Sequence, residues 1–381
     1  MSTNRKFVFW QNMVSFHQSC FLHCLSKREN VEVILVAVVA IEEKREKMGW
    51  KVPEMGRVKI ITSPEEAVMN KILQDSDENT FHIFSGFDRE PLFRNAFSYV
   101  ISHGLHLGIM AEPYDWLGIK GKLRYMRSVY HRLRYGKNID FVLAIGNKGM
   151  EVYHKAGYDS NKIFEWGYFV ESKPAVNLNK HDGYKVIYAG SLLPYKGVHT
   201  LVKAWSKLKR EDIELNIVGE GPEFPMLQHL VNDLTLHNVK FSGFAENDKI
   251  RQLIGEHDLF VLPSVLKEGW GAVVNEALMQ GTPVVCTDHC GASVLLGDHN
   301  YSTVIKAGDI ERLAVELDGR ISAGKTRESI RAKIRTWSEC LSGEHATDYF
   351  LDIIKCVSEG GPIPRAPWRK DRTGSQGVLT D

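Results

Sequence analysis

The chain has 381 residues, is 43% hydrophobic and 25% charged, and carries a formal net charge of +1. The length exceeds that at which one hydrophobic core usually stops growing, and the composition excludes a disordered or fibrous chain, so two globular domains are expected. Because the net charge is nearly zero, attraction to phosphate or to anionic lipid has to come from a local group of residues.

The beginning of the sequence lacks the features of an export signal. Residues 1–12 contain one short apolar run and no cleavage site of the secretory type, and the longest apolar run, 31–41, is shorter than the ~20 residues that cross a bilayer. Six cysteines without an export signal are interpreted as reduced thiols, and a zinc site is the less favoured alternative because their spacing does not match one. We therefore expect a cytoplasmic protein.

Short β-branched or aromatic runs alternate with segments of helical periodicity, which is typical of βα units that build parallel sheets in an α/β fold. In the first half, strands are predicted at 6–10, 31–39, 58–62, 80–85, 105–110, 141–145 and 162–166. In the second half, strands are predicted at 185–189, 214–218, 239–242, 259–263, 283–287 and 302–305. A polar stretch at 171–183 is expected to link the two domains, 1–172 and 183–338. A helix at 339–357 is expected to return to the first domain, followed by a mobile tail at 358–381.

The segment 259–288, LFVLPSVLKEGWGAVVNEALMQGTPVVCTD, is the richest in chemical groups. A buried strand ends at Pro263, and a helix is predicted to start near Gly271 and to stop at Gly281. In parallel α/β sheets ligands bind beyond the carboxyl ends of the strands, where a helix start offers N–H groups and a partial positive charge to an anion. Gly269 and Gly271 let a diphosphate approach the backbone without a Cβ clash.

Two glutamates of this segment, Glu268 and Glu276, are eight positions apart and are expected to face one ligand, because side chains lean toward the start of their helix. Carboxylates repel a diphosphate, so their natural partners are sugar hydroxyls. The alternative is a surface loop acid followed by a helix acid that only favours the helix dipole.

Positive charge for a diphosphate is expected from the segment VIYAGSLLPYKGVHTLVKAW. Its strand ends at Gly190, and Lys196 stands just before Gly197 and the next helix, where an ammonium would stabilise a leaving phosphate. The alternative is a solvated loop lysine. A third loop, VGEGP at 218–222, has the glycines of a tight strand-to-helix turn but is common on its own.

These motifs occur in the order found in family 4, or group 1, retaining glycosyltransferases, whose nucleotide-binding domain residues 185–288 resemble. The resemblance implies a GT-B fold, in which two Rossmann-like domains with parallel sheets face each other across a cleft. It also implies transfer of a sugar from a UDP- or GDP-linked donor to a saccharide or lipid-linked saccharide acceptor, in the synthesis of cell-surface polysaccharide or lipopolysaccharide.

The resemblance assigns roles to individual residues. Glu268 would reach the hydroxyls of the donor sugar, Glu276 the ribose and Lys196 the phosphates, so that Glu268 and Lys196 are the catalytic candidates. Ser191 stands where the family often has a basic residue, which would leave Lys196 as the sole neutralising cation of its domain. The other donor-side candidates are Gly190, Gly219, Gly243, Phe244 and the backbone amides of Gly271, Ala272 and Val273.

The first half departs from the family, because a polar loop follows its first strand where relatives often have a glycine-rich one. The acceptor-side candidates are His17 and Asn12 from this region and Glu112, which follows the strand at 105–110. A lone histidine is also a common packing or capping residue.

Retaining transfer on this fold requires stabilisation of the leaving group more than a protein nucleophile, and a donor phosphate oxygen can take the proton of the acceptor. Asp75 and Asp77 form an Asp-x-Asp motif, but it precedes a predicted strand instead of following one, so a solvated loop is favoured. We expect neither a metal ion nor any other cofactor.

The segment 120–137, KGKLRYMRSVYHRLRYGK, contains no acidic residue and interleaves basic with apolar side chains. Such a helix suits the surface of an anionic membrane, which predicts a peripheral protein on the inner face of the cell membrane. The alternative is an ordinary helix with a solvated basic face, and one basic helix is weak support for nucleic acid binding. The candidate contacts are Lys122, Arg124, Arg127, Arg132 and Arg134.

Two other functions remain compatible with these patterns. A nucleotide-sugar epimerase of the same fold would act on the donor without an acceptor. A non-catalytic partner subunit would retain the fold but lose the charged residues. The presence of Lys196, Glu268 and Glu276 therefore argues against this alternative.

Overall fold

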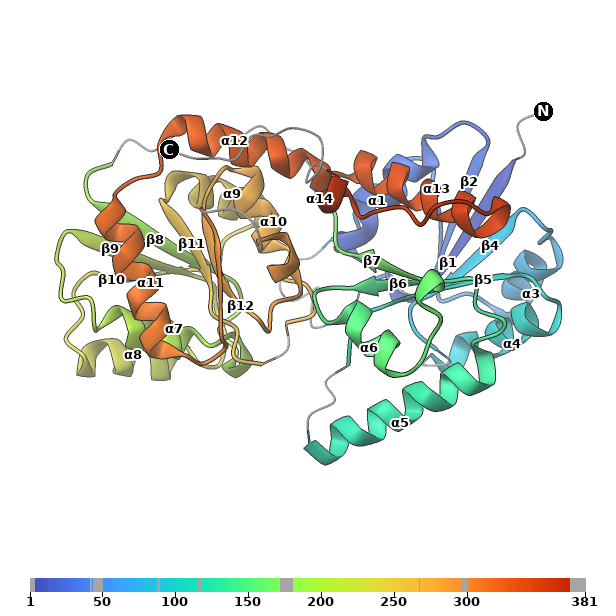
Figure 1. Ribbon diagram of the computed structural model, residues 1–381, viewed down its shortest axis with the longest axis horizontal. Coiled ribbons are helices and arrows are strands. Elements are labelled where there is room, and N and C mark those ends of the chain that lie inside the picture. The colour runs from blue at the N-terminus through green and yellow to red at the C-terminus, as the bar shows by residue number, and fades with distance from the viewer. Residues whose placement is uncertain are drawn as a thin grey trace. The chain divides into compact units, whose positions relative to one another are not determined.

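The computed structural model describes residues 4–41, 43, 51–87, 90–114, 118–171, 181–266, 268–296 and 301–370. The chain divides into two compact units, of which the first comprises Met1–Glu171 with Cys340–Asp381 and the second Ser172–Glu339. Each unit contains one parallel sheet with helices on its faces (Figure 1), which confirms the predicted α/β class.

The first unit contains a sheet in the order β3-β2-β1-β4-β5-β6-β7. Its strands are β1 (Arg5–Met13), β2 (Val31–Val39), β3 (Lys59–Thr62), β4 (Thr80–Phe84), β5 (His106–Ala111), β6 (Phe141–Ile145) and β7 (Ile163–Trp166). Its helices are α1 (Phe16–Ser26), α3 (Glu66–Gln74), α4 (Arg94–Ser102), α5 (Gly118–Tyr135), α6 (Gly149–Lys155), α13 (Gly343–Glu359) and α14 (Pro367–Lys370).

The second unit contains a sheet in the order β10-β9-β8-β11-β12-β13. Its strands are β8 (Tyr184–Ala189), β9 (Ile213–Val218), β10 (Val239–Gly243), β11 (Leu259–Leu262), β12 (Val284–Thr287) and β13 (Thr303–Ile305). Its helices are α7 (Val198–Trp205), α8 (Phe224–Asp233), α9 (Asn247–Glu256), α10 (Val273–Met279), α11 (Ile310–Ala323) and α12 (Glu328–Ser338). Every strand predicted from the sequence is present, and most of the predicted ends lie within one or two residues of the observed ends.

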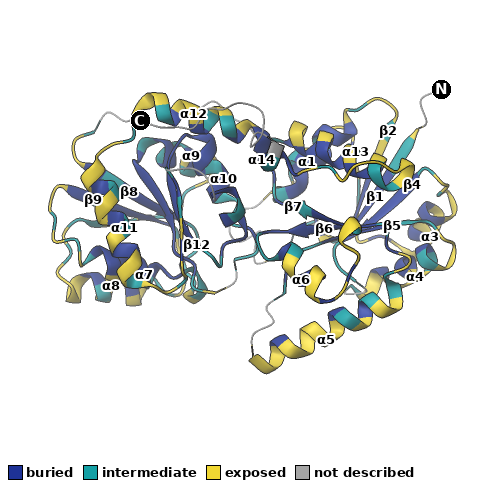
Figure 2. Ribbon diagram, in the orientation of Figure 1, coloured by how far each residue is buried: buried dark blue, intermediate teal, exposed yellow. Residues whose placement is uncertain are grey.

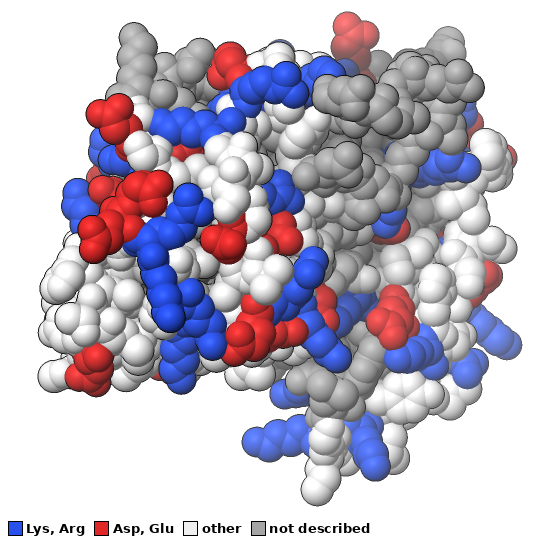
Figure 3. All heavy atoms as spheres, turned by 60° about the vertical axis from the view of Figure 1, so that its left-hand side comes forward, with Lys and Arg blue, Asp and Glu red and all other residues white. Residues whose placement is uncertain are grey.

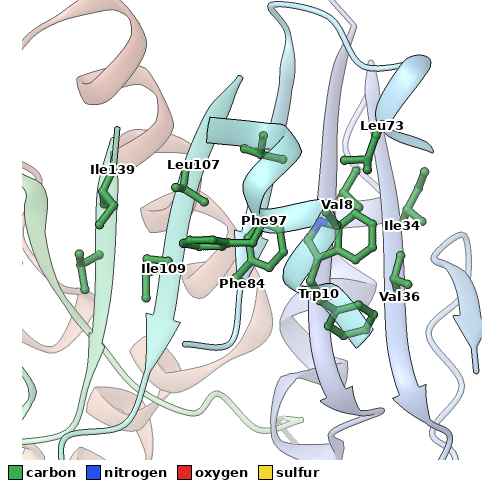
Figure 4. Packing of buried hydrophobic residues seen from close by; sticks show 14 of the residues in the cluster. Val8, Trp10, Ile34, Val36, Leu73, Phe84, Phe97, Leu107, Ile109 and Ile139 are labelled. Carbon is green, nitrogen blue, oxygen red and sulfur yellow. The ribbon is translucent and has the colours of Figure 1, made fainter. Parts of the chain in front are cut away.

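Burial on both faces explains why the strands are continuous apolar runs. Along β1, Val8 and Trp10 point to one face of the sheet, where Trp10 stacks on Phe84 with 5.5 Å between ring centroids. Figure 4 shows this face, and in Figure 2 most strands of both sheets are buried while the outer surfaces of the helices are exposed. Phe7 points to the opposite face and meets Phe350 of α13 edge-on, with 5.1 Å between ring centroids. The last long helix is therefore part of the first core.

The expectation of a mobile tail from residue 358 is wrong for residues 366–369. Trp368 is 3% exposed, and its Nε1 donates to Glu165 Oε2 at 3.1 Å, while Arg369 forms an ion pair with the same carboxylate. The large apolar surface of one tryptophan is enough to hold a short segment whose composition is otherwise polar. Residues 371–381 lie outside the described part of the chain.

Candidate functional site

The strand order of the second sheet reverses between β8 and β11. The loops that follow these two neighbouring strands therefore begin next to each other at the carboxyl edge of the sheet and lead away in opposite directions. In open α/β sheets this reversal is where ligands bind. Lys196 follows β8 and Glu268 follows β11. Two of the predicted site residues therefore come from the two strands that flank the expected ligand position.

The loops after β8, β9 and β10 contact each other through their backbones. The N–H of Gly190 donates to Val218 O at 3.0 Å, and the N–H of Gly219 donates to Gly243 O at 2.7 Å. Gly219 has φ +137°, and a Cβ there would lie 1.9 Å from Gly190 O, so only glycine fits. The structure thus brings together three glycines that the sequence placed on separate loops.

The loop that carries Lys196 packs directly on the end of β11. Gly197 has φ +68°, and a Cβ there would lie 2.2 Å from Pro263 O. The N–H of Val265 donates to Tyr195 O at 2.9 Å. These backbone contacts hold the loop after β8 against the loop after β11.

The side chains of Lys196 and Glu268 meet across this contact. Lys196 Nζ lies 2.5 Å from Glu268 Oε2, and Ser264 Oγ donates to the same oxygen at 3.2 Å. Each of the two charged side chains is only 13% exposed. A solvated loop lysine is therefore excluded, because this ammonium is largely removed from water and paired with a carboxylate.

The turn from Glu268 into α10 is fixed by the strand end beside it. Glu268 forms an isolated bridge with Cys290, and a Cβ at Gly271, which has φ +89°, would lie 2.9 Å from Cys290 Sγ. Trp270 is 1% exposed and its Nε1 donates to Asn275 Oδ1 at 2.8 Å. Ala272 is the N-cap of α10 and Val273 its first residue, two positions later than the predicted start.

Glu276 lies on α10 and has a partner that sequence reasoning missed. Arg251 of α9 places Nη1 3.5 Å from Glu276 Oε1, and the same guanidinium also forms an ion pair with Asp248. Burial raises the pKa of Glu276 to about 7, the nearby Arg251 lowers it and Asp248 raises it. The two predicted acids are thus held by different cations, Glu268 by Lys196 and Glu276 by Arg251.

The remaining donor-side candidates lie at strand ends as predicted. Ser191 is half-buried and its carbonyl accepts from the hydroxyl of Tyr188 at 2.9 Å. Phe244, directly after β10, is 54% exposed. A large exposed aromatic ring at this edge can stack on a planar base.

In the first unit, two of the three acceptor-side candidates are joined through a residue that the sequence did not single out. The ring of His17 stacks on Tyr168, with 4.9 Å between centroids and 8° between planes. The hydroxyl of Tyr168 donates to Glu112 Oε1 at 2.7 Å. Asn12 is an exposed residue near the end of β1. Tyr168 follows β7 by two residues, and a search for polar side chains after every predicted strand would have found it.

The Asp-x-Asp motif lies in the turn before β4, as expected. Asp77 Oδ1 accepts from Thr80 Oγ1 at 2.8 Å and from Asn79 N at 3.0 Å, and the hydrogen bond from Thr80 lowers the pKa of Asp77. Its carboxylate thus stabilises a turn. Among the residues that the structure describes, no group of three or more His, Cys, Asp or Glu side chains is arranged to hold a metal ion.

Helix α5 is exposed along nearly its whole length (Figure 2). An apolar stripe runs along it at helical spacing, with exposed fractions of 50–81%: Ile119, Leu123, Met126, Tyr130 and Leu133. Four of the predicted membrane contacts are exposed: Lys122, Arg124, Arg127 and Arg134. Figure 3 shows basic and uncharged side chains at the projecting end of this helix, at the bottom of the view. Arg132 is half-buried and its Nε donates to Ala156 O at 3.4 Å, so it faces the body of the unit. No described helix is both long and apolar enough to cross a membrane.

Residues 169–337, nearly the same range as the second unit, match the family described as "Glycosyl transferases group 1". The second unit is therefore similar to the group 1 glycosyltransferases. The chain is 29% identical over 175 residues to the lipopolysaccharide core biosynthesis glycosyltransferase LpsE of Rhizobium meliloti, covering 45% of this chain and 50% of LpsE. It is 30% identical over 170 residues to the amylovoran biosynthesis glycosyltransferase AmsK of Erwinia amylovora, covering 41% of each chain. The chain thus matches half or less of the length of these curated relatives.

Solved structures resemble the whole chain. Anabaena Alr3699/HepE in complex with UDP has a TM-score of 0.71 at 16% identity, covering 92% of this chain and 99% of HepE. The lipopolysaccharide outer core galactosyltransferase WaaB has a TM-score of 0.68 at 16% identity, covering 92% of this chain and 99% of WaaB. At this identity the likeness shows the fold alone, which is GT-B, as the sequence predicted.

Proposed function

We propose that the chain is a retaining glycosyltransferase that moves a sugar from a UDP- or GDP-linked donor to a saccharide or lipid-linked saccharide. The observation that carries the proposal is the largely buried contact between Lys196 and Glu268 at the point where the strand order of the second sheet reverses. An ammonium and a carboxylate side by side suit a ligand that has phosphate at one end and hydroxyls at the other. HepE has been solved with UDP and with UDP-glucose, which agrees with such a donor.

In the proposed complex the diphosphate replaces Glu268 as the partner of Lys196. The released carboxylate then accepts hydrogen bonds from hydroxyls of the donor sugar, helped by Ser264, whose hydroxyl already lies 3.2 Å from it. The backbone amides of Gly271, Ala272 and Val273 face the phosphates in the proposal, because the glycine lets a ligand approach closely. Phe244 borders the base.

The transfer breaks the bond between the anomeric carbon and the phosphate oxygen, and forms a bond from the acceptor oxygen on the same face of the sugar. The acceptor proton passes to an oxygen of the departing diphosphate, and Lys196 stabilises the negative charge as it develops. No protein carboxylate serves as the base, and no metal or other cofactor takes part. A chelator that abolishes activity, with recovery on adding a divalent cation, would contradict this part.

On the acceptor side we propose the group of His17, Tyr168 and Glu112 in the first unit. A hydrogen-bonded tyrosine and carboxylate beside an imidazole offer both donors and acceptors to sugar hydroxyls. The names of LpsE and AmsK support a saccharide acceptor in lipopolysaccharide or cell-surface polysaccharide synthesis.

The donor is tested by thermal shift with UDP, GDP and their sugars, since a ligand that binds the native state raises its stability. We expect one nucleotide series to raise the melting temperature of the wild type but not of Glu276→Ala. Mass analysis of the product and the anomeric configuration by NMR then test the reaction. A product with the mass of the donor would indicate an epimerase, and an inverted anomeric centre would refute retention.

We further propose that α5 lies on the anionic inner surface of the cell membrane. Its apolar stripe is flanked by exposed cations, and its 18 residues include no acid, so two copies of the helix would repel each other whereas anionic lipid attracts them. Each basic residue near such a surface contributes about 1 kcal/mol.

Vesicle flotation tests this contact. We expect binding to vesicles with 30% anionic lipid, little binding to neutral ones, and a loss of about tenfold or more for the pair Arg124→Glu and Arg127→Glu. The pair Lys203→Glu and Lys240→Glu, exposed lysines of the second unit, makes the same charge change and should bind as the wild type does. Equal binding to both kinds of vesicle would refute the proposal.

A further inference from the structure

Helices α9 and α10 lie side by side in the second unit (Figure 1) and enclose one charged side chain from each. Arg251 is 8% exposed, and its Nη1 lies 3.5 Å from Glu276 Oε1. The side chain of Glu276 is 13% exposed. A guanidinium and a carboxylate so far removed from water stabilise each other, because either one alone would be costly to bury.

The contact between these two groups is incomplete. The distance of 3.5 Å is long for a charge-assisted hydrogen bond, which normally spans ~2.7–2.9 Å. Nε of Arg251 is buried and has no hydrogen-bond partner among the described residues. The guanidinium of Arg251 therefore has unused donor capacity next to its long contact with Glu276.

We propose that Arg251 is a positioning residue for the nucleotide sugar, which keeps the carboxylate of Glu276 charged and oriented to accept hydroxyl groups of the bound donor. This inference rests on the proposed function and adds to it a residue from outside the motif segment. Arg251 acts through Glu276 and need not touch the donor itself.

Other charged groups of the packed helices do not replace Arg251. On α9, the exposed Asp248 pairs with Arg251 itself. The two arginines of α12, which packs on α10, have other partners. Arg331 donates to the carbonyls of Gly255 and His257, and Arg335 pairs with Glu328. The charge of Glu276 thus depends on Arg251, which favours it, and on Asp248, which opposes it.

The dependence on pH follows from these groups. Burial raises the pKa of Glu276 to about 7, so its charged form becomes dominant only above neutral pH. If the carboxylate accepts donor hydroxyls, affinity for the donor rises between about pH 6 and pH 8 and then levels off. Loss of the Arg251 charge moves this rise to higher pH, and loss of the Asp248 charge moves it to lower pH.

The test is isothermal titration calorimetry of the full chain with UDP-glucose and, in parallel, GDP-mannose at about pH 6, 7 and 8. Nucleotide sugars are used because they lack the terminal phosphate whose second pKa is near ~6. For Arg251→Met we expect about fivefold weaker binding at pH 7, since a pKa raised by about one unit reduces the ionised fraction from about a half to about a tenth. Arg251→Lys should recover most of this loss.

Two variants on the surface of α9 complete the design. Asp248→Asn, at a side chain 72% exposed, should bind up to about twofold more tightly at pH 7, with the midpoint of the pH profile moved down. Lys249→Gln removes a positive charge from the same helix at an exposed position, and its pH profile should match the wild type. Asp248→Asn keeps the test decisive even if Arg251→Met does not fold, which circular dichroism would reveal.

Three results would overturn the inference. A wild type that binds a donor with no pH dependence, affinity that falls as pH rises, or unshifted midpoints in Arg251→Met and Asp248→Asn would each refute the role of Arg251 and leave the proposed function standing. Failure of the wild type to bind either nucleotide sugar would instead refute both.

Discussion

The contact between Lys196 and Glu268 predicts that each side chain destabilises the second unit when its partner is removed. Deleting one member of a fully buried ion pair costs about 3–5 kcal/mol, because the remaining charge is left without compensation. Each side chain here is 13% exposed, so some water reaches the remaining charge. We therefore expect about 2–3 kcal/mol for Lys196→Met and for Glu268→Gln, which in a unit of this size corresponds to a fall of roughly 4–12 °C in melting temperature.

The double variant distinguishes a specific pair from two unrelated losses. Since Lys196→Met together with Glu268→Gln leaves neither charge unpaired, the double variant should be about as stable as either single one, with a coupling energy of about 2 kcal/mol. The assay is differential scanning calorimetry of the full chain, following the transition that a bound nucleotide shifts upward. Lys203→Met, which removes an exposed lysine from α7, should change the melting temperature little.

Additive losses would refute this reasoning. If the double variant loses the sum of the two single losses to within about 0.5 kcal/mol, the two side chains do not share one interaction in solution. The proposed displacement of Glu268 by a diphosphate would then lose its basis as well. A Glu268→Gln protein that is as stable as the wild type would lead to the same conclusion.

Three further predictions concern the packing. Gly219→Ala should lower the unfolding free energy by several kcal/mol and abolish nucleotide binding, because its Cβ would lie 1.9 Å from Gly190 O. The control Gly308→Ala, at φ +77° with no atom within 4 Å of the added Cβ, should cost only about 1–2 kcal/mol. Similar losses of the two variants in urea unfolding would show that backbone strain, and not the close approach to Gly190, determines the cost. Burial lowers the pKa of His82 to about 3, whereas in the unfolded chain it is about 6.5. Between these values only the unfolded chain binds the proton, so the free energy of unfolding falls by up to ~1.4 kcal/mol for each pH unit. In His82→Phe the drop in stability from pH 7 to pH 5 should be about 2 kcal/mol smaller than in the wild type, and an equal drop would contradict this. Trp368→Ala should lower the stability of the first unit by about 2–4 kcal/mol in urea unfolding, and no loss would mean that the last described helix does not pack in solution.

The fold followed from local patterns because most strands of these sheets are buried on both faces and consist of apolar residues, whereas the edge strands β3 and β10 are partly exposed. The same patterns placed Lys196 and Glu268 after strands, at the edge where ligands bind. They could not show that the two side chains touch, since they are 72 positions apart and meet only because β8 lies beside β11. The strand order, which no local pattern contains, decides that contact.

The failed and missing predictions have a common physical origin. The average composition of 358–381 predicts a mobile tail, whereas the single large side chain of Trp368, packed beside Glu165, outweighs the polar residues around it. Tyr168 was missed because a single half-buried aromatic residue after a short strand has no distinctive neighbours in sequence.

Arg251 shows why the charge of a buried acid is a tertiary property. The sequence around it, NDKIRQLIGE, is that of an ordinary amphipathic helix, in which a basic residue is expected to face water. Arg251 is instead 8% exposed, and its Nη1 lies 3.5 Å from Glu276 Oε1 on the neighbouring α10. The segment that contains Glu276 fixes where the carboxylate lies, whereas the ionisation of that carboxylate near neutral pH depends on a helix more than twenty residues earlier. Two proteins that share the glutamate motif can therefore differ in how their nucleotide affinity responds to pH, according to the residue that this earlier helix places beside the second acid.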